Sequence, residues 1–361
     1  MRIVYDAFEG RYADNPRALH EALLARGDDH EHLWLLDPRA AAGFPPGVAT
    51  ARYGSHEGRR ALESADLVIA NTHVDRAWSK RDRTFFLQTW HGTPLKRIHA
   101  DVLWAPEGRL ERLQDDIDRW DLLLSPNRPS TPLLRRAFRY DGEVLESGYP
   151  RNDVLLAPDR EARRARVREQ LEIPEGRRVV LYAPTWRDDE VFTAGGRSFA
   201  LPFDVGAFVE QRGEDHVLLL RLHYMLKERL AGVADHPAVR DVCAWPDISD
   251  LYLAADVLVT DYSSTMFDFA VTGRPMLFYV YDLEDYAERL RGFYLDFAAE
   301  APGPLLRTTQ SVLDALGDLD AVAEEHAAAL ERFRARYTHL EDGRATERVL
   351  DAVLERVAAR A

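Results

Sequence analysis

A histidine and two cations follow one apolar segment of the sequence. The segment "TFFLQTW" is typical of a buried strand, and it leads directly into His91, Gly92 and Thr93, with Lys96 and Arg97 close behind. An imidazole titrates near neutral pH, and glycine lets a substrate approach the backbone. A lone histidine after a strand is often only a loop residue with its hydrogen bonds made. Together with the two cations, the pattern favours a functional site over a simple turn.

A second segment, "DVLVTDYSSTMFDFAVTG", joins a strand pattern to a helix pattern. The residues Ser263, Ser264 and Thr265 stand at the expected start of the helix. Free backbone N–H groups, hydroxyl donors and the positive end of the helix dipole favour an anion there. The segment therefore predicts a site for a phosphate or diphosphate. Helix capping is the simpler explanation, but it accounts for one hydroxyl and not for the other.

Other polar residues follow apolar runs in the C-terminal half, in "APTWRDD" and "LRLHY". Trp186 and Arg187 are consistent with stacking on a base or binding a phosphate, and equally with closing the core and pairing with a nearby aspartate. In open parallel sheets, ligands bind outside the carboxyl ends of the strands. Because polar residues follow several of the predicted strands, the assignment of each one to a binding site is strengthened.

Apolar runs of strand length alternate with helical patterns along the whole chain, which predicts parallel βαβ units. With 361 residues, the chain is long enough for two cores. We therefore expect an α/β fold of two doubly wound, Rossmann-like domains: an N-terminal domain over 1–155 and a C-terminal domain over 156–361 that ends in a helical tail.

Composition excludes several classes of protein. The net charge of −14 argues against a nucleic-acid-binding protein, because such affinity rests on Lys and Arg neutralising phosphates. A single cysteine, Cys243, permits no intramolecular disulfide and suits a reducing compartment. We see neither a signal peptide nor a spanning segment, so we expect a cytoplasmic protein with at most peripheral membrane contact.

Several motifs in fixed order resemble the CDP-glycerol glycerophosphotransferases of teichoic acid and capsule synthesis. They are "TWHGTPLK", "SGYPRND", "VLYAPTWRDD", "LRLHY", "DISDLYLAADVLVTDYSSTMFDFAVTGRPMLFY" and "GFYLDF". The resemblance implies a GT-B-type fold, with two domains facing a cleft. It also implies transfer of glycerol phosphate or ribitol phosphate from a CDP-activated donor to a hydroxyl, releasing CMP.

The resemblance also implies roles for individual residues. His91 matches the family's base on the acceptor hydroxyl, and Gly92, Thr93, Lys96 and Arg97 fall on the acceptor and phosphate side. His223 matches a second catalytic histidine, at the donor diphosphate, although the proline that often follows it is replaced here by tyrosine. The implied donor-binding residues are Arg221, Asp250, Asp261, Ser263 and Ser264.

Two other functions stay open: a glycosyltransferase that uses a nucleotide sugar, and a non-catalytic nucleotide-binding scaffold. We expect no cofactor and no tightly bound metal, because cationic side chains and a helix terminus can neutralise a diphosphate. The resemblance implies CDP-glycerol or CDP-ribitol as donor and a lipid-linked glycan as acceptor. A lipid-linked acceptor requires work at the inner face of the membrane. The basic candidates for contact there are "KRDR" at 80–83, "LKRI" at 95–98 and the helix-like "LLRRAFRY", with Arg135, Arg136 and Arg139.

Overall fold

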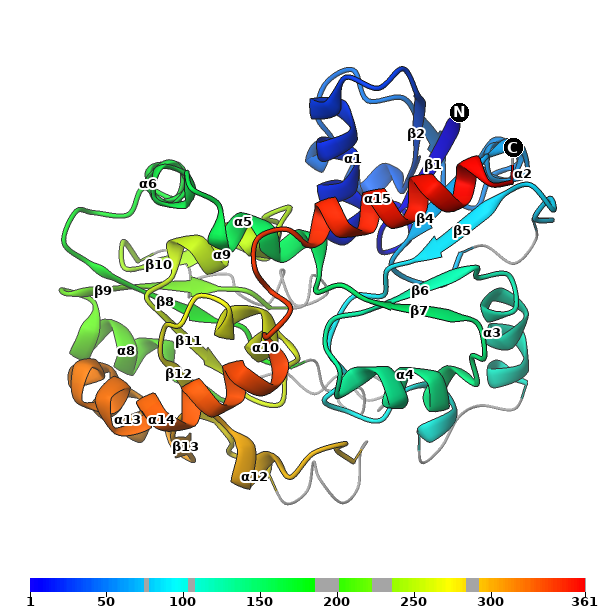
Figure 1. Cartoon of the computed structure of the whole chain (residues 1–361). Helices are drawn as coiled ribbons and strands as arrows, with labels where there is room; N and C mark the ends of the chain where they lie inside the picture. The colour runs from blue at the N-terminus through cyan, green and yellow to red at the C-terminus, as the bar shows by residue number, and fades with distance from the viewer. Residues whose placement is uncertain (75–77, 103–107, 186–200, 223–235, 284–291, 361) are drawn as a thin grey trace. The chain divides into compact units, whose positions relative to one another are not determined.

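The computed structural model describes residues 1–74, 78–102, 108–185, 201–222, 236–283 and 292–360. It divides into two compact units (Figure 1). The first comprises Met1–Ala157 together with Tyr337–Ala361, and the second comprises Pro158–Arg336. The first break along the chain lies close to the boundary expected at 155.

The first unit is built on a seven-stranded parallel sheet with strand order β3-β2-β1-β4-β5-β6-β7. The order reverses beside β1, as in doubly wound folds. The strands are β1 (Arg2–Asp6), β2 (Glu31–Leu36), β3 (Thr50–Arg52), β4 (Leu67–Ala70), β5 (Phe85–Gln88), β6 (Leu122–Ser125) and β7 (Glu143–Glu146). The helices are α1 (Asp14–Arg26), η1 (Pro38–Gly43), α2 (His56–Ser64), η2 (His99–Asp101), α3 (Arg109–Ile117), α4 (Ser130–Phe138), η3 (Pro150–Asn152), α5 (Asp153–Leu156) and α15 (Ala345–Ala358).

Alternate residues of these strands enter two different cores. Tyr5 and Ile69 pack with Leu19 of α1 on one face of the sheet. Val4 and Val68 point to the other face, into a core shared with α2 and α4. Because both faces are buried, the central strands β4, β5 and β6 are almost entirely apolar, which is why the sequence alone predicts them.

The last helix, α15, corrects the expectation that a helical tail belongs to the C-terminal domain. Val349, Leu350 and Val353 of α15 are fully or almost fully buried in the core that β1 and α1 form in the first unit. Figure 1 shows this helix, in red, alongside α1 and β4. Its apolar stripe demands a buried partner, and helical periodicity cannot say which sheet supplies it.

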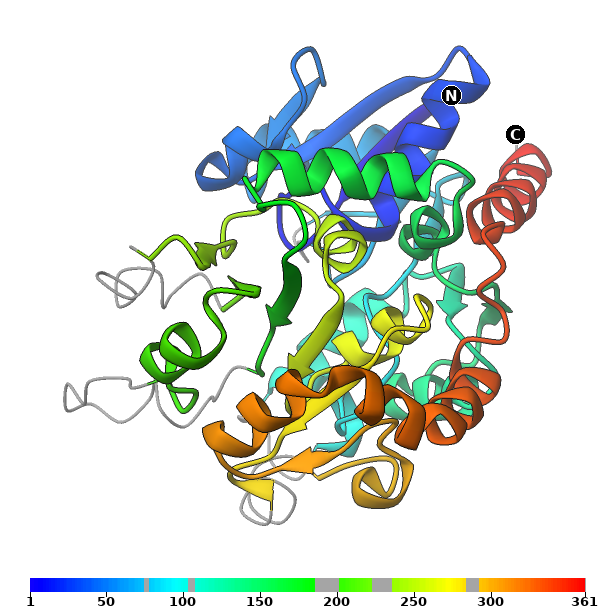
Figure 2. The same cartoon turned by 90° about the vertical axis from the view of Figure 1, so that its left-hand side faces the viewer.

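The second unit holds a six-stranded parallel sheet with order β10-β9-β8-β11-β12-β13. Its strands are β8 (Arg178–Tyr182), β9 (His216–Leu220), β10 (Val239–Asp241), β11 (Val257–Thr260), β12 (Met276–Tyr279) and β13 (Leu305–Leu306). Its helices are α6 (Arg160–Gln170), α8 (Val205–Arg212), α9 (Ile248–Ala254), α10 (Thr265–Ala270), α12 (Phe297–Glu300), α13 (Thr309–Gly317) and α14 (Leu319–Tyr337). Figure 2 shows α13 and α14, in orange, following one another on this unit.

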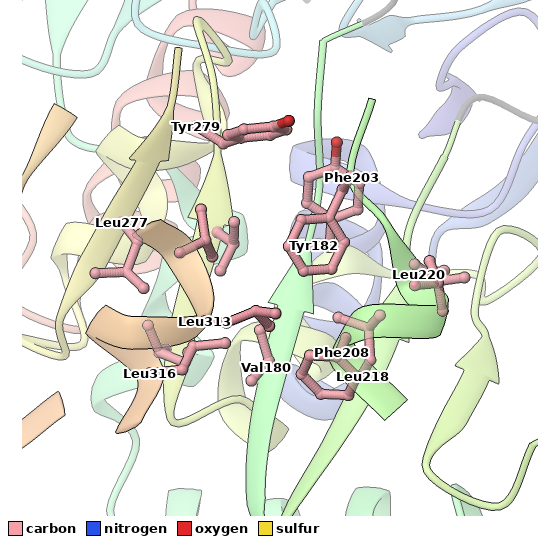
Figure 3. Close-up of a cluster of buried hydrophobic side chains, with 14 of the residues drawn as sticks. Val180, Tyr182, Phe203, Phe208, Leu218, Leu220, Leu277, Tyr279, Leu313 and Leu316 are labelled. Carbon is pink, nitrogen blue, oxygen red and sulfur yellow. The ribbon is translucent and has the colours of Figure 1, made fainter. Parts of the chain in front are cut away.

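One face of the second sheet packs against α8 and α13. Figure 3 shows Tyr182 and Leu218 from the strands meeting Phe208 of α8 and Leu313 of α13. A rigid core of this kind fixes where each strand ends, and therefore where the loops that carry polar residues begin.

Two short strands, β3 and β13, could not be recognised from the sequence. They have three and two residues, too few to show a strand pattern. In the described part of the chain, no helix combines the length and the apolar character needed to span a membrane.

Candidate functional site

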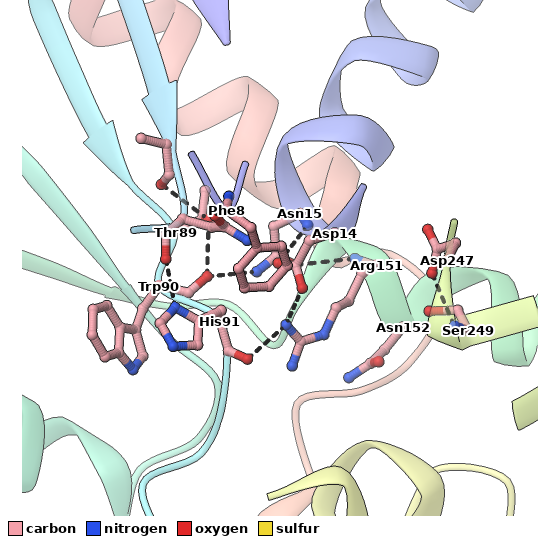
Figure 4. A network of polar contacts seen from close by, with 12 residues as sticks. Phe8, Asp14, Asn15, Thr89, Trp90, His91, Arg151, Asn152, Asp247 and Ser249 are labelled. Carbon is pink, nitrogen blue, oxygen red and sulfur yellow. Dashed lines mark hydrogen bonds and ion pairs between the residues drawn. The ribbon is translucent and has the colours of Figure 1, made fainter. Parts of the chain in front are cut away.

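The turn after β5 carries His91 in the first unit. Trp90 precedes it with a φ of 52°, a left-handed conformation that is uncommon for residues other than glycine. The turn is held from both sides, because Asn15 donates from Nδ2 to the Trp90 carbonyl over 3.1 Å and the Trp90 N–H donates to Oε1 of Gln88 over 2.9 Å. Figure 4 shows this network around the His91 ring. Backbone strain held in this way is common at functional sites.

A short hydrogen bond to the main chain orients the His91 imidazole. Its Nδ1 lies 2.6 Å from the carbonyl oxygen of Asn71, which can only accept, so Nδ1 carries the hydrogen. In the neutral ring, Nε2 then holds the lone pair. Burial lowers the pKa of His91 below that of an ordinary histidine, outweighing the Asn71 carbonyl and Asp14, which act in the opposite direction. The ring is therefore a neutral base at physiological pH.

A buried ion pair between Arg151 and Asp14 supports the same turn. Nη1 of Arg151 lies 2.6 Å from Oδ2 of Asp14 and donates to the His91 carbonyl over 2.8 Å. Both side chains are almost fully buried, at 3% and 7% exposure. The Arg151 N–H also donates to Oδ1 of Asn15, 3.1 Å away.

The sequence did not reveal this support. The helix-like segment "NPRALHEALLARG" begins at Asn15 and leaves Asp14 outside it, and "GYPRND" is typical of a structural corner, from which Arg151 and Asn152 could reach a ligand. The signal available in the sequence was the charged Arg151 within "GYPRND", a motif of residues that favour turns. It indicates a buried charge but not its partner.

The residues after His91 differ in exposure. Gly92 and Thr93 are buried, and Oγ1 of Thr93 accepts from Nδ2 of Asn127 over 3.1 Å. Lys96 is half-buried and Arg97 is exposed. Gly92 and Thr93 thus belong to the frame of the turn, whereas Arg97 lies where an anion in solution can reach it.

In the second unit, Asp261 follows β11 and is 2% exposed. Its Oδ1 accepts from the Thr185 N–H over 2.7 Å, which joins the ends of β11 and β8. The carboxylate therefore shapes the turn that follows β11.

Arg221 follows β9 and binds backbone rather than standing open to solvent. Its Nη1 donates to the carbonyl oxygens of Val242, Cys243 and Trp245 at 2.7, 2.9 and 2.6 Å. The side chain thus ties the end of β9 to the segment after β10. The neighbouring His223 lies outside the described residues, as do Trp186 and Arg187.

The serines before α10 contribute little to capping. Oγ of Ser263 accepts from the Thr265 N–H at a long 3.4 Å, and Ser264, at the N-cap position, makes no side-chain capping bond. Both residues are half-buried. Capping therefore explains neither hydroxyl well, which favours the anion-binding interpretation.

Asp250 lies in the first turn of α9 and accepts from Nε1 of Trp245 over 3.2 Å. The N-cap of this helix is Asp247, whose Oδ1 accepts from the Ser249 N–H over 2.9 Å. Asp247 therefore caps α9, and Asp250 holds the same tryptophan segment that Arg221 binds.

Each unit is a doubly wound parallel sheet with polar residues after its strands, which defines the chain as an α/β protein of the class that binds nucleotides and similar ligands at strand ends. The chain belongs to the CDP-glycerol:poly(glycerophosphate) glycerophosphotransferase family, whose model matches residues 1–355. This confirms the family and the α/β fold class predicted from the motifs.

Similar proteins agree with this assignment. The chain is 38% identical to the teichoic acid glycerol-phosphate transferase of Staphylococcus aureus, over 98% of this chain and 92% of that protein. It is 35% identical to the teichoic acid poly(glycerol phosphate) polymerase of Bacillus subtilis, over 98% of this chain but only 48% of the polymerase. A solved structure of the wall teichoic acid polymerase TagF, a histidine-to-alanine variant, matches with a TM-score of 0.91 at 32% identity, over 99% of this chain and 90% of that one.

Proposed function

We propose that this chain transfers glycerol phosphate from CDP-glycerol to a hydroxyl of an acceptor and releases CMP. The observation that carries the proposal is the His91 ring, held with Nδ1 on a carbonyl and Nε2 available as a base, in a chain of this family. The acceptor oxygen attacks the phosphorus of the glycerol phosphate, the bond to the CMP oxygen breaks, and the hydroxyl proton passes to Nε2 of His91.

The first unit is proposed to serve the acceptor. Trp90 and Arg151 hold His91 in place, so the base needs little reorganisation during the reaction. Lys96 and Arg97 are proposed to bind the acceptor's phosphate, with Gly92 and Thr93 forming the turn between them and the base.

The second unit is proposed to hold the donor. The Ser263 and Ser264 hydroxyls and the backbone N–H groups that open α10 suit a diphosphate, and Asp261 fixes the turn that presents them. His223 keeps its proposed place at the diphosphate by family resemblance. Arg221 and Asp250 are proposed to act indirectly, by shaping the segment between Val242 and Trp245.

Glycerol phosphate is proposed in preference to ribitol phosphate because the relatives above are named for glycerol phosphate. A TagF variant was also studied after soaking with CDPG. Purified protein should therefore release CMP from CDP-glycerol in the presence of a lipid-linked acceptor, and much less from CDP-ribitol. UDP release from UDP-sugars would instead indicate a glycosyltransferase, and CDP binding without turnover would indicate a scaffold.

A lipid-linked acceptor implies work at the inner face of the cell membrane, and we propose peripheral contact there through charge alone. The helix α4 does not offer an apolar surface, because Leu134 and Phe138 are buried in the core of the first unit. Arg136 pairs with Asp101 over 2.9 Å, which leaves Arg135 and Arg139 as the better basic candidates. Sedimentation with anionic vesicles should show weak binding that added salt removes; binding indifferent to salt would contradict this proposal.

A further inference from the structure

A second oriented histidine lies in the first unit, outside the motifs that the sequence singled out. Nδ1 of His73, in the segment after β4, lies 3.0 Å from Oδ2 of Asp116 in α3. The carboxylate of Asp116 is fully buried. It also accepts from Nε1 of Trp120 over 3.1 Å and pairs with Arg119 over 3.3 Å. Oδ2 takes both hydrogen bonds, while Oδ1 faces the Arg119 guanidinium. A carboxylate paired with arginine has no hydrogen to donate, so Nδ1 of His73 carries a hydrogen.

The other nitrogen of His73, Nε2, is left for a ligand. The ring is stacked on Trp120, with centroids 5.7 Å apart, and lies 5.9 Å from the His99 ring. The side chain keeps 21% exposure. Within the described ranges, the bond to Asp116 is the hydrogen bond that His73 makes. A histidine whose Nδ1 is fixed by a buried carboxylate is a common arrangement at sites where Nε2 does the chemistry or the binding.

His73 and His91 share one neighbour. The Trp90 ring lies 4.1 Å from the His91 ring and 6.3 Å from the His73 ring, measured between centroids. Each imidazole has its Nδ1 fixed on an oxygen acceptor, so each offers Nε2, and both lie around one indole.

We propose that His73, as an imidazolium that donates Nδ1–H to Asp116, binds a phosphate oxygen of the acceptor through Nε2–H, beside the hydroxyl that His91 deprotonates. The inference rests on the proposed function and names the acceptor's chemistry: a terminal glycerol phosphate, in which a three-carbon chain joins the reactive hydroxyl to the phosphate. A base and a phosphate ligand for such a group must be close neighbours. His73 is then a substrate-binding residue, and Asp116 positions it.

The first test compares two substitutions of His73. In His73→Asn, the amide nitrogen takes the place of Nδ1 and keeps the bond to Asp116, but Nε2 is gone; His73→Ala loses both. Because a hydrogen bond to a charged group contributes about 1.5–3 kcal/mol, both variants should raise the KM for the acceptor by about 10- to 100-fold. The KM for CDP-glycerol should stay as in the unmodified protein.

A purely structural role for His73 predicts a different result. His73→Asn would then behave as the unmodified protein, and only His73→Ala would lose stability and activity, which overturns the proposal. His99→Asn is the matched control, because it removes an adjacent ring while an amide can keep the bond that Nδ1 of His99 makes to the Ala137 carbonyl, 3.0 Å away. An equal rise in acceptor KM in that variant would show that packing of the rings, rather than Nε2, sets the KM.

A second test needs no turnover. Glycerol 3-phosphate, added to protein labelled with ¹⁵N at histidine, should shift the Nε2 resonance that disappears in His73→Asn. A shift without any transferase activity would leave the phosphate site standing while the proposed function fails. Suppose instead that the protein is an active transferase, that the His73 resonance does not shift, and that the His73 variants keep the acceptor KM of the unmodified protein. The proposed role of His73 would then be rejected, while the proposed function would stand.

Discussion

The carbonyl oxygen of Asn71 lies 2.6 Å from Nδ1 of His91, and this contact decides which nitrogen of the histidine is available as a base. A backbone carbonyl cannot donate, so the neutral ring is held in a single tautomer. No side-chain substitution at position 71 removes that oxygen. The orientation of the base is therefore set by the path of the main chain after β4.

Replacing His91 by alanine should reduce kcat by about 10²- to 10⁴-fold, the usual contribution of a general base. CDP-glycerol binding should survive, because the proposed donor residues belong to the second unit. Isothermal titration with CDP-glycerol and a CMP-release assay measure the two properties separately. A folded variant that no longer binds the donor would argue against this division of roles.

The pH dependence of kcat/KM should reflect the lowered pKa of His91. The base is active only when deprotonated. As the pH is lowered from neutral, kcat/KM should therefore stay constant until the pH is below the ordinary imidazole pKa of about 6.5, and only then decrease. Asp14 and Arg151 are the nearby charges, acting in opposite directions. A fall centred above that value would show that another group limits the reaction.

The pair of Arg151 and Asp14 should matter for both folding and activity. In Arg151→Met, the buried Asp14 carboxylate loses its partner, so we expect a loss of about 3–5 kcal/mol in the free energy of unfolding. Arg163→Met is the matched control: its pair with Asp159 is 2.9 Å long but exposed, and its loss should cost less than about 1 kcal/mol.

A double variant, Arg151→Met with Asp14→Asn, should recover part of that stability, because no buried charge is left unpaired. Its kcat should stay low, since the bond from Arg151 to the His91 carbonyl is still missing. Urea unfolding and steady-state kinetics on the same samples test both statements. Full recovery of kcat would show that Arg151 does not position the turn.

Replacing Ser263 and Ser264 together by alanine should weaken CDP-glycerol binding by about tenfold or more, the loss expected for hydrogen bonds to a charged diphosphate. Stability should fall by less than about 1 kcal/mol, because the capping contact is long. Ser55→Ala is the comparison, since Ser55 caps α2 with a 3.1 Å bond to the Gly58 N–H. It should lower the melting temperature without changing donor affinity. Unchanged donor affinity in the double serine variant would contradict the anion-binding interpretation and favour helix capping.

Asp6, at the end of β1, is fully buried, and burial raises the pKa of its carboxyl to about 8. The folded protein therefore binds a proton more tightly than the unfolded chain, so this group lowers stability as pH rises from about 4 to about 8. Asp6→Asn should raise the melting temperature at neutral pH, with a gain of up to a few kcal/mol that shrinks towards pH 4. Thermal melts across this range measure the effect, and a gain that does not vary with pH would contradict the assignment.

Most of the fold could be predicted from the sequence, for a simple physical reason. Strands buried on both faces must be apolar throughout, and α1, α4 and α6 carry a helical period, so both are visible in local composition. The position of His91 after β5 and of the serines before α10 followed from the same patterns. The motif order then sufficed for the family.

The sequence determined which residues stand at strand ends, but only the tertiary structure decided how they are held. Asp14 and Arg151 are 137 positions apart, and His73 meets Asp116 across 43, separations at which no local pattern carries information. The same holds for α15, which joins the core beside α1 in the first unit, and for Arg221, whose guanidinium binds three carbonyls. A buried charge or an apolar stripe requires a partner, and which partner it finds depends on the three-dimensional path of the whole chain.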